Sequence, residues 1–152
     1  MIRIPVEKTD SLITGLLRTE FFDSLEMIRL ELTTSVTRSV DGRIQRGFYD
    51  SEEEIPGEYI RWKDEKSRFF DAMRGKILPL QFKIVFWYPK AESDQLFGRD
   101  TEGTSLYINV SYDRNNTFLT TGFAQNSFPQ DQSFGREWDD FVQSVIRNLE
   151  IS

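Results

Sequence analysis

The sequence contains neither cysteine nor histidine. Without cysteine there are no disulfides, thiolate metal sites, iron–sulfur clusters or cysteine nucleophiles, and a reducing compartment fits this composition. Without histidine there is no Ser-His-Asp triad, no histidine general base and no zinc or iron site that needs imidazole ligands. The remaining catalytic options are carboxylate, lysine, tyrosine or serine chemistry, or a Mg²⁺ or Ca²⁺ site built from oxygen ligands.

Basic residues in excess and long apolar runs are also lacking. The formal net charge is −6 and the pI is about 4.8, which opposes binding to a nucleic-acid backbone. No apolar run approaches the ~20 residues that a membrane helix needs, and residues 1–10 show no signal-peptide pattern. Phosphate-binding, dinucleotide-binding, zinc and nucleophile-elbow motifs are missing as well. We therefore expect a cytoplasmic protein with no membrane association and no cofactor.

The amino acids that are present predict one folded domain over residues 1–152. The chain has 152 residues, of which 38% are hydrophobic and 29% charged, and this composition is typical of a globular domain. Phenylalanine is abundant, with 13 residues, so aromatic side chains should form much of the core.

The densest apolar run lies between two prolines, Pro79 and Pro89, and predicts the central strand of a sheet. Its alternation divides the side chains between two faces. The expected core face holds Leu80, Phe82, Ile84 and Phe86. The other face holds Gln81, Lys83, Val85 and Trp87.

A second long alternation predicts a strand over Glu26–Val40, and Asp41-Gly42 then predicts a hairpin turn. A three-residue loop, with Ser39 opposite Arg43, keeps the apolar residues of both strands on one face. A two-residue loop is the alternative and separates them.

The remaining patterns complete an α+β fold with a mainly antiparallel sheet, in the order β-α-β-β-α-β-β-β-α. Gly122 inside the last strand predicts a bulge or the close approach of another backbone. The last helix has an apolar stripe at steps of three and four, which is typical of a core-facing surface. The other expected strands are Met1–Pro5, Ser105–Tyr112 and Thr117–Gln125, and the expected helices run from Thr9 or Asp10 to Thr19, over Glu58–Arg74 and over Phe134–Glu150.

Four segments together resemble an uncharacterised bacterial family that is known only as a domain of unknown function. They are T-R-S-V-D-G-R-I-Q-R-G-F-Y-D at 37–50, R-G-K-I-L-P-L-Q-F-K-I-V-F at 74–86, L-T-T-G at 119–122 and R-E-W-D at 136–139. The resemblance covers most of the chain in the same order and departs from the family at Lys90–Gly103 and Phe123–Asn126. It implies a small cytosolic protein and brings no catalytic residues.

The favoured functional hypothesis is a non-catalytic binding or interaction module. The non-core face of the predicted sheet mixes aromatic and polar side chains, and an uncovered face of this kind suits a protein strand, a peptide or a small ligand. The chain also has three predicted amphipathic helices that could cover this face, and we expect a helix to cover Trp87. The candidate binding residues are Lys83, Trp87, Tyr107, Asn109 and Thr121, with Val85 and Phe123 beside them.

Two other functions remain open. A divalent-metal-dependent enzyme would use carboxylates at predicted strand ends, namely Asp41, Asp50, Glu53 and Asp113. The acidic run Asp50–Glu54 itself reads either as a solvated loop or as a cation site, and its spacing is not that of a calcium loop. Nucleic-acid binding would use Arg38, Arg43, Arg46 and Lys83, against the acidic balance of the chain.

Overall fold

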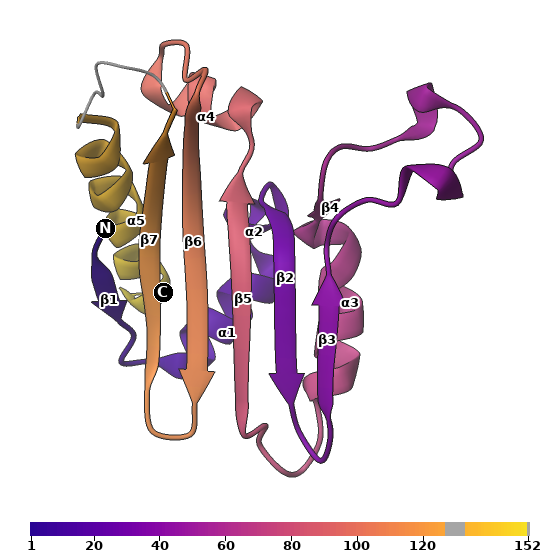
Figure 1. Cartoon of the computed structure of the whole chain (residues 1–152). Helices are drawn as coiled ribbons and strands as arrows, with labels where there is room; N and C mark the ends of the chain where they lie inside the picture. Colours follow the sequence, from indigo (N-terminus) through magenta and orange to yellow (C-terminus); the bar gives the residue numbers. More distant parts are fainter. Residues whose placement is uncertain (127–132, 152) are drawn as a thin grey trace.

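One antiparallel sheet and one layer of helices make up the described chain (Figure 1). The computed structural model describes residues 1–126 and 133–151. Within these residues the strands are β1 (Arg3–Pro5), β2 (Glu26–Thr33), β3 (Thr37–Asp41), β4 (Ile60–Arg61), β5 (Gln81–Tyr88), β6 (Thr104–Asp113) and β7 (Thr117–Gln125). The α-helices are α1 (Thr9–Arg18), α2 (Glu20–Asp23), α3 (Trp62–Met73), α4 (Lys90–Phe97) and α5 (Ser133–Ile151). The predicted α+β class is confirmed.

The strand order across the sheet is β1-β7-β6-β5-β2-β3, and the short β4 pairs with β2 beyond the end of β3. Every pairing in the described chain is antiparallel. Strand β5 lies between β6 and β2, so the run between Pro79 and Pro89 forms an inner strand, as predicted. Strand β1 lies at one edge of the sheet, beside β7.

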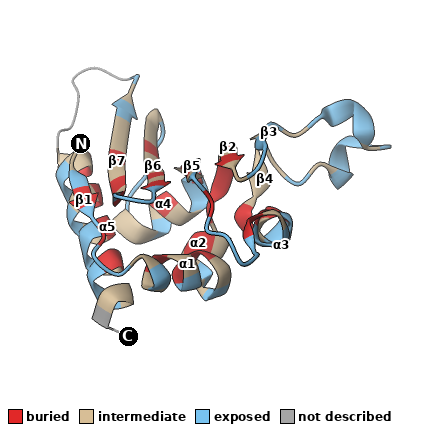
Figure 2. Ribbon diagram, turned by 90° about the horizontal axis from the view of Figure 1, so that it is seen from below, coloured by how far each residue is buried: buried red, intermediate tan, exposed pale blue. Residues whose placement is uncertain are grey.

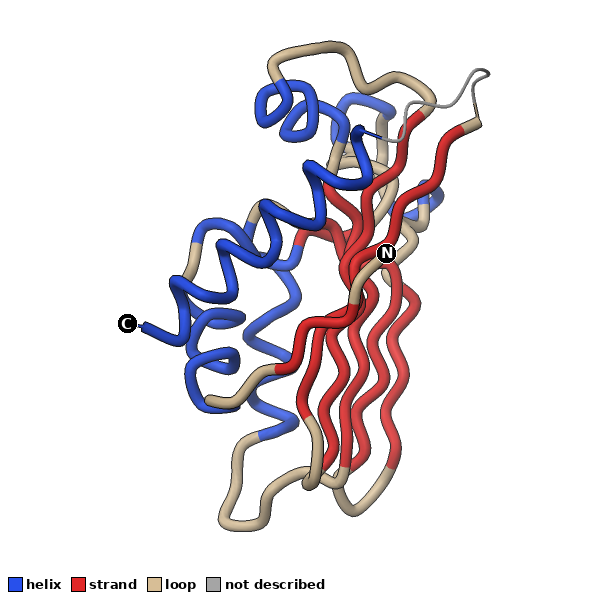
Figure 3. Tube along the Cα trace, turned by 90° about the vertical axis from the view of Figure 1, so that its left-hand side faces the viewer, coloured by secondary structure: helices blue, strands red, loops and turns tan. Residues whose placement is uncertain are grey.

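Helices α1, α2, α3 and α5 pack on one face of the sheet, and the core lies between the two layers (Figure 3). Aromatic contacts join the layers: the ring centroids of Phe86 and Trp62 lie 5.2 Å apart, and those of Phe69 and Phe82 also lie 5.2 Å apart. Each large side chain that is fully buried here contributes about 1.5–3 kcal/mol to stability. The stripe of α5 faces this core, as predicted. None of the described helices has the length and apolar content of a membrane-crossing helix.

The opposite face of the sheet has no helix over it in the described part of the chain (Figure 3). The expectation that a helix covers Trp87 is therefore wrong. An amphipathic helix has one apolar stripe and packs where the sheet is most apolar. That is the face of Phe82, Ile84 and Phe86, each of which is fully buried. We call the uncovered side the open face.

The predicted strand over Glu26–Val40 is instead a hairpin. It turns at residues 34–36 to give β2 and β3, with Leu30 opposite Val40 and Thr33 opposite Thr37. In this register even-numbered residues pair with even-numbered residues, so the alternation continues unbroken through the turn. One long strand and this hairpin therefore have the same apolar pattern, and the pattern alone does not distinguish them. The predicted turn at Asp41-Gly42 is wrong, because the chain turns at residues 34–36.

Residues 43–59 form an arm that projects from the edge of the sheet between β3 and β4 (Figures 1 and 2). The arm holds two short 3₁₀ turns, at Arg46–Phe48 and Glu52–Glu54. Its base is closed by the amide of Ile44, which donates to the carbonyl of Glu58 over 2.9 Å. The predicted helix at Glu58 begins only at Trp62, because the two residues before Trp62 pair with β2 as strand β4.

Candidate functional site

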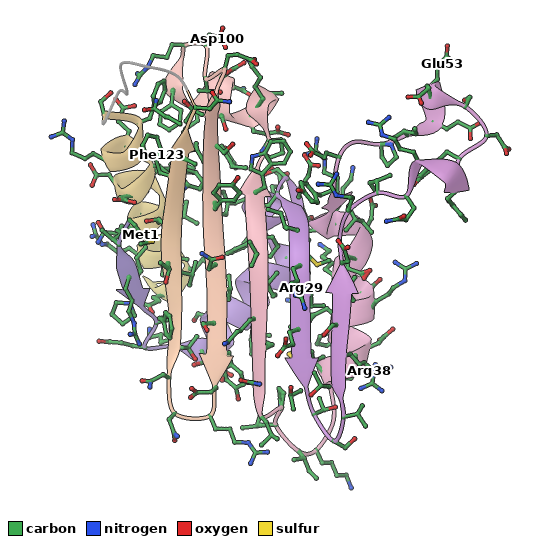
Figure 4. All side chains as sticks on the ribbon, in the orientation of Figure 1. Met1, Arg29, Arg38, Glu53, Asp100 and Phe123 are labelled. Atoms are coloured by element: carbon green, nitrogen blue, oxygen red, sulfur yellow. The ribbon has the colours of Figure 1, made fainter. Side chains whose placement is uncertain are left out.

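The centre of the open face is formed by neighbouring strands β2, β5 and β6 (Figure 4, with this face toward the viewer). Trp87 on β5 lies opposite Tyr107 on β6. Val85, two residues earlier, lies between Asn109 on β6 and Arg29 on β2. These side chains are partly exposed, apart from the exposed Arg29. They form a surface with aromatic, aliphatic, amide and cationic groups.

Four of the five predicted binding residues share this face. Lys83 lies opposite Ser111, one pair further along β5 and β6 from Val85, and joins Trp87, Tyr107 and Asn109 on the open side. The structure thus brings these four together.

Thr121 and its neighbour Phe123 lie on the helix side, so their predicted place on the open face is wrong. The turn between Asp113 and Asn116 pairs odd-numbered residues of β6 with even-numbered residues of β7. Gly122, not Thr121, therefore lies opposite Tyr107. Thr121 is fully buried, donates its hydroxyl to Asp139 of α5 and accepts the amide of Ile2 over 3.0 Å.

Because Gly122 has no side chain, the Tyr107 side chain can pack directly against the backbone of β7. A Cβ added at Gly122 would lie 3.1 Å from the Cβ of Tyr107 and 3.6 Å from its ring atom Cδ2. The register of β6 and β7 runs without a bulge, and the group that comes close to Gly122 is the Tyr107 side chain, not another backbone as predicted. The Tyr107 ring therefore leans toward β7.

Trp87 leans the other way, toward Tyr59 at the base of the arm. The two ring centroids lie 6.0 Å apart with an interplanar angle of 75°, an edge-to-face contact. The backbone amide of Tyr59 donates over 2.8 Å to the carboxylate of Glu26, which is buried beneath it. Tyr59 therefore forms a fixed wall at one side of the open face.

A buried polar network supports this wall. Burial raises the pKa of the Glu26 carboxyl above its ordinary value, and the Tyr59 amide and the Arg61 guanidinium partly oppose the shift. Arg61 donates to the carbonyl of Ser24 over 2.7 Å and to Glu92 over 3.1 Å. The second carboxylate oxygen of Glu92 is buried and has no hydrogen-bond partner in the described residues. These bonds hold the base of the arm against β2 and α4.

The open face carries both signs of charge. Asp41 lies opposite Arg29, and Glu31 lies opposite Lys83. No carboxylate of the described residues comes within 4.0 Å of either cation. The face is therefore close to neutral overall, with two cations available to a ligand.

The residues of the two competing hypotheses do not converge. Asp41 ends β3 and Asp113 ends β6, whereas Asp50 and Glu53 lie on the arm (Figure 4). No group of three acidic residues that could hold a metal ion occurs in the described chain. The basic residues are scattered in the same way: Arg38 lies on β3, Arg43 and Arg46 on the arm, and Lys83 on the open face.

Two residues of the site were missed from the sequence. Tyr59 falls within the helix predicted over Glu58–Arg74, because its spacing to Trp62 and Phe69 fits helical periodicity. Arg29 lies within the strand predicted over Glu26–Val40, and no pattern distinguishes it there from an ordinary surface arginine.

The sequence matches the family described as a family of unknown function (DUF5721) over residues 15–152. This match confirms the resemblance found from the four sequence segments. No curated protein and no solved structure matches the chain.

Proposed function

The chain belongs to DUF5721, a family of unknown function, and we propose that it is a non-catalytic binding module whose open face binds a segment of another protein. The observation that carries this proposal is the uncovered sheet face around Val85, Trp87 and Tyr107, flanked by Arg29 and Lys83 (Figures 3 and 4).

The composition of the face supports a protein partner. Tryptophan, tyrosine and arginine are enriched in the centres of protein interfaces, where they supply most of the binding energy. A nucleic acid would instead need a basic surface, whereas the cations Arg29 and Lys83 face the acidic residues Asp41 and Glu31. The bound segment should therefore present apolar side chains to Val85 and Trp87, with polar groups of both signs around them.

The geometry also supports binding more than catalysis. The buried carboxyl beside the face, Glu26, accepts the Tyr59 amide and holds the arm in place. No nucleophile paired with a general base lies beside it in the residues described, and reaction chemistry without histidine or cysteine needs such a pair from other side chains. The second hypothesis, a carboxylate-based divalent-metal-dependent enzyme, gains no support because its carboxylates lie apart.

A cytoplasmic location and a bacterial source belong to the same proposal. The absence of cysteine fits a reducing compartment. The bacterial source rests on the resemblance of the four segments 37–50, 74–86, 119–122 and 136–139.

A displayed library of random peptides tests the binding function. The full chain is immobilised, and enriched peptides are synthesised and their Kd measured on the wild type and on two variants. Trp87→Ala should weaken binding at least about tenfold, the loss typical of an interface hot spot. The control is Phe48→Ala, which removes an aromatic ring from the arm and should leave the Kd unchanged. A lack of enriched peptides, equal binding to the Trp87 variant, or tight binding of a single-stranded RNA in a parallel titration contradicts the proposal.

A further inference from the structure

Three loops lie at the lower end of the sheet in Figure 1, and they carry a group of exposed aliphatic side chains. We call them the basal loops: residues 34–38, 74–80 and 113–116. Ile77 is 77% exposed and Leu78 is 66% exposed, in the loop that joins α3 to β5. Together with Leu80 and Arg114 they line an apolar hollow of about 510 Å³. This volume is in the range of ordinary ligand pockets.

The rim of this hollow is basic, although the whole chain is acidic. The basal loops contain four basic residues and one acidic residue, Asp113. Arg74 lies 3.6 Å from Asp71 on α3. Arg38, Lys76 and Arg114 lie within ion-pair distance of no carboxylate in the described chain.

The arm has the opposite character. Phe48, in the first 3₁₀ turn of the arm, is 82% exposed, and its ring meets that of Tyr49 edge to face at 5.4 Å. Residues 43–59 contain five acidic residues and two arginines. Both arginines are used within the arm, on Glu52 at 3.1 Å and on Glu58 at 3.9 Å. The three other carboxylates, Asp50, Glu53 and Glu54, have no cation within ion-pair distance in the described chain.

We propose that the arm of one copy of this chain docks into the basal hollow of a second copy, with Phe48 in the hollow. An exposed aromatic ring then meets an exposed aliphatic hollow. Three unpaired carboxylates meet three unpaired cations, and this complementarity favours the arm of a second copy over a neutral partner. The two surfaces lie at opposite ends of the hairpin formed by β2 and β3, so they do not meet within one chain (Figure 1).

The contact is heterologous, because each copy uses a different surface for each neighbour. Contact between two basal hollows would set cations against cations, which is unfavourable. Heterologous contacts generate rings or open chains of copies. An arm of this length covers less than the ~800 Å² per partner of a standard interface, so we expect a Kd on the order of 10–100 μM.

Sedimentation velocity of the full chain, from about 1 to about 500 μM, tests the assembly. The average mass of the wild type should rise with concentration and fall again at high salt, where charge pairing is screened. Phe48→Ser and Ile77→Asp should each weaken self-association at least about tenfold. Both changes are at exposed positions, so both variants should fold as the wild type does.

Mixing the two variants gives the sharpest result. Phe48→Ser keeps a working hollow and Ile77→Asp keeps a working arm, so an equimolar mixture should form a one-to-one complex that grows no further. The control is Tyr107→Ser on the open face, which should assemble like the wild type. This control also separates the inference from the proposed function, because assembly that fails only with Tyr107→Ser belongs to the open face and overturns the arm contact.

Three results overturn the inference. They are a wild type that stays monomeric over the whole range, variants that assemble unchanged, and a mixture that behaves as the sum of its parts. Binding of the monomer to phosphatidylglycerol vesicles through Ile77 would assign the basal hollow to an anionic lipid surface and overturn it as well.

Discussion

Gly42 lies where the chain leaves β3 for the arm, and its substitution by alanine should be among the most destabilising single changes in the protein. A Cβ added there would lie 1.8 Å from the carbonyl oxygen of Met27 and 2.8 Å from its carbonyl carbon. Both are backbone atoms of β2, so no side-chain rotation relieves the overlap. Gly42 also donates its amide to Ile28 and accepts the amide of Ile60, each over 2.8 Å.

The expected loss follows from these contacts. Moving the backbone far enough to clear the carbonyl breaks two hydrogen bonds, each with a net value of about 0.5–1.5 kcal/mol. Overpacking strain adds about 1–3 kcal/mol. The lower chain entropy of alanine in the unfolded state returns only about 0.4–1 kcal/mol. Gly42→Ala should therefore lower the free energy of unfolding by about 1–5.5 kcal/mol, a large part of the ~5–15 kcal/mol of a typical domain.

Urea unfolding followed by tryptophan fluorescence measures this loss, and thermal unfolding should show a fall in Tm of about 2–22 °C. The matched control is Gly47→Ala on the arm, where an added Cβ meets no atom within 4 Å. Its free energy of unfolding should stay within about 0.5 kcal/mol of the wild type. If Gly42→Ala is as stable as this control, the described junction between β3 and the arm is incorrect.

Two further predictions concern buried polar groups. Thr121→Val removes the hydroxyl that bonds Asp139 and Ile2, and urea unfolding should show a loss of about 1–3 kcal/mol. Thr120→Val, on the open face, should change stability by less than about 0.5 kcal/mol, and equal losses for both would contradict the assigned faces. Because burial raises the pKa of Glu26, the native state holds this proton more tightly than the unfolded state, and stability falls as pH rises from about 4.5 through the native pKa. Glu26→Gln should flatten this part of the pH dependence of the unfolding free energy, and an unchanged slope would contradict the burial.

Local sequence patterns predicted the strands and helices that have one clearly apolar face and one clearly polar face. The central strand and the last helix have clear apolar faces, and both lie where the sequence predicted them. Leu80 shows the limit of this reasoning. It continues the alternation of Phe82 and Ile84, yet it is 49% exposed, because the sheet and its helix layer end before it.

The candidate site was predicted only in part. Lys83, Trp87, Tyr107 and Asn109 follow from alternation along two strands, and they meet because these strands are neighbours. The sequence did not predict that Thr121 lies on the helix side. The side on which each β7 residue lies depends on whether the short turn between β6 and β7 pairs odd-numbered residues with odd-numbered or with even-numbered ones. Tyr59 reaches Trp87 only because β4 pairs with β2 and turns the base of the arm toward the sheet.

The sequence by itself determined the absence of thiol and imidazole chemistry, the acidic charge and the set of apolar faces, because composition and periodicity are properties of single segments. The tertiary structure decided which face of the sheet stays open, where the long alternating run turns, and that an acidic arm and a basic hollow lie at opposite ends of one hairpin. These features depend on how the strands pair and on which face of the sheet the helices pack against. Both are set by contacts between residues far apart in the chain.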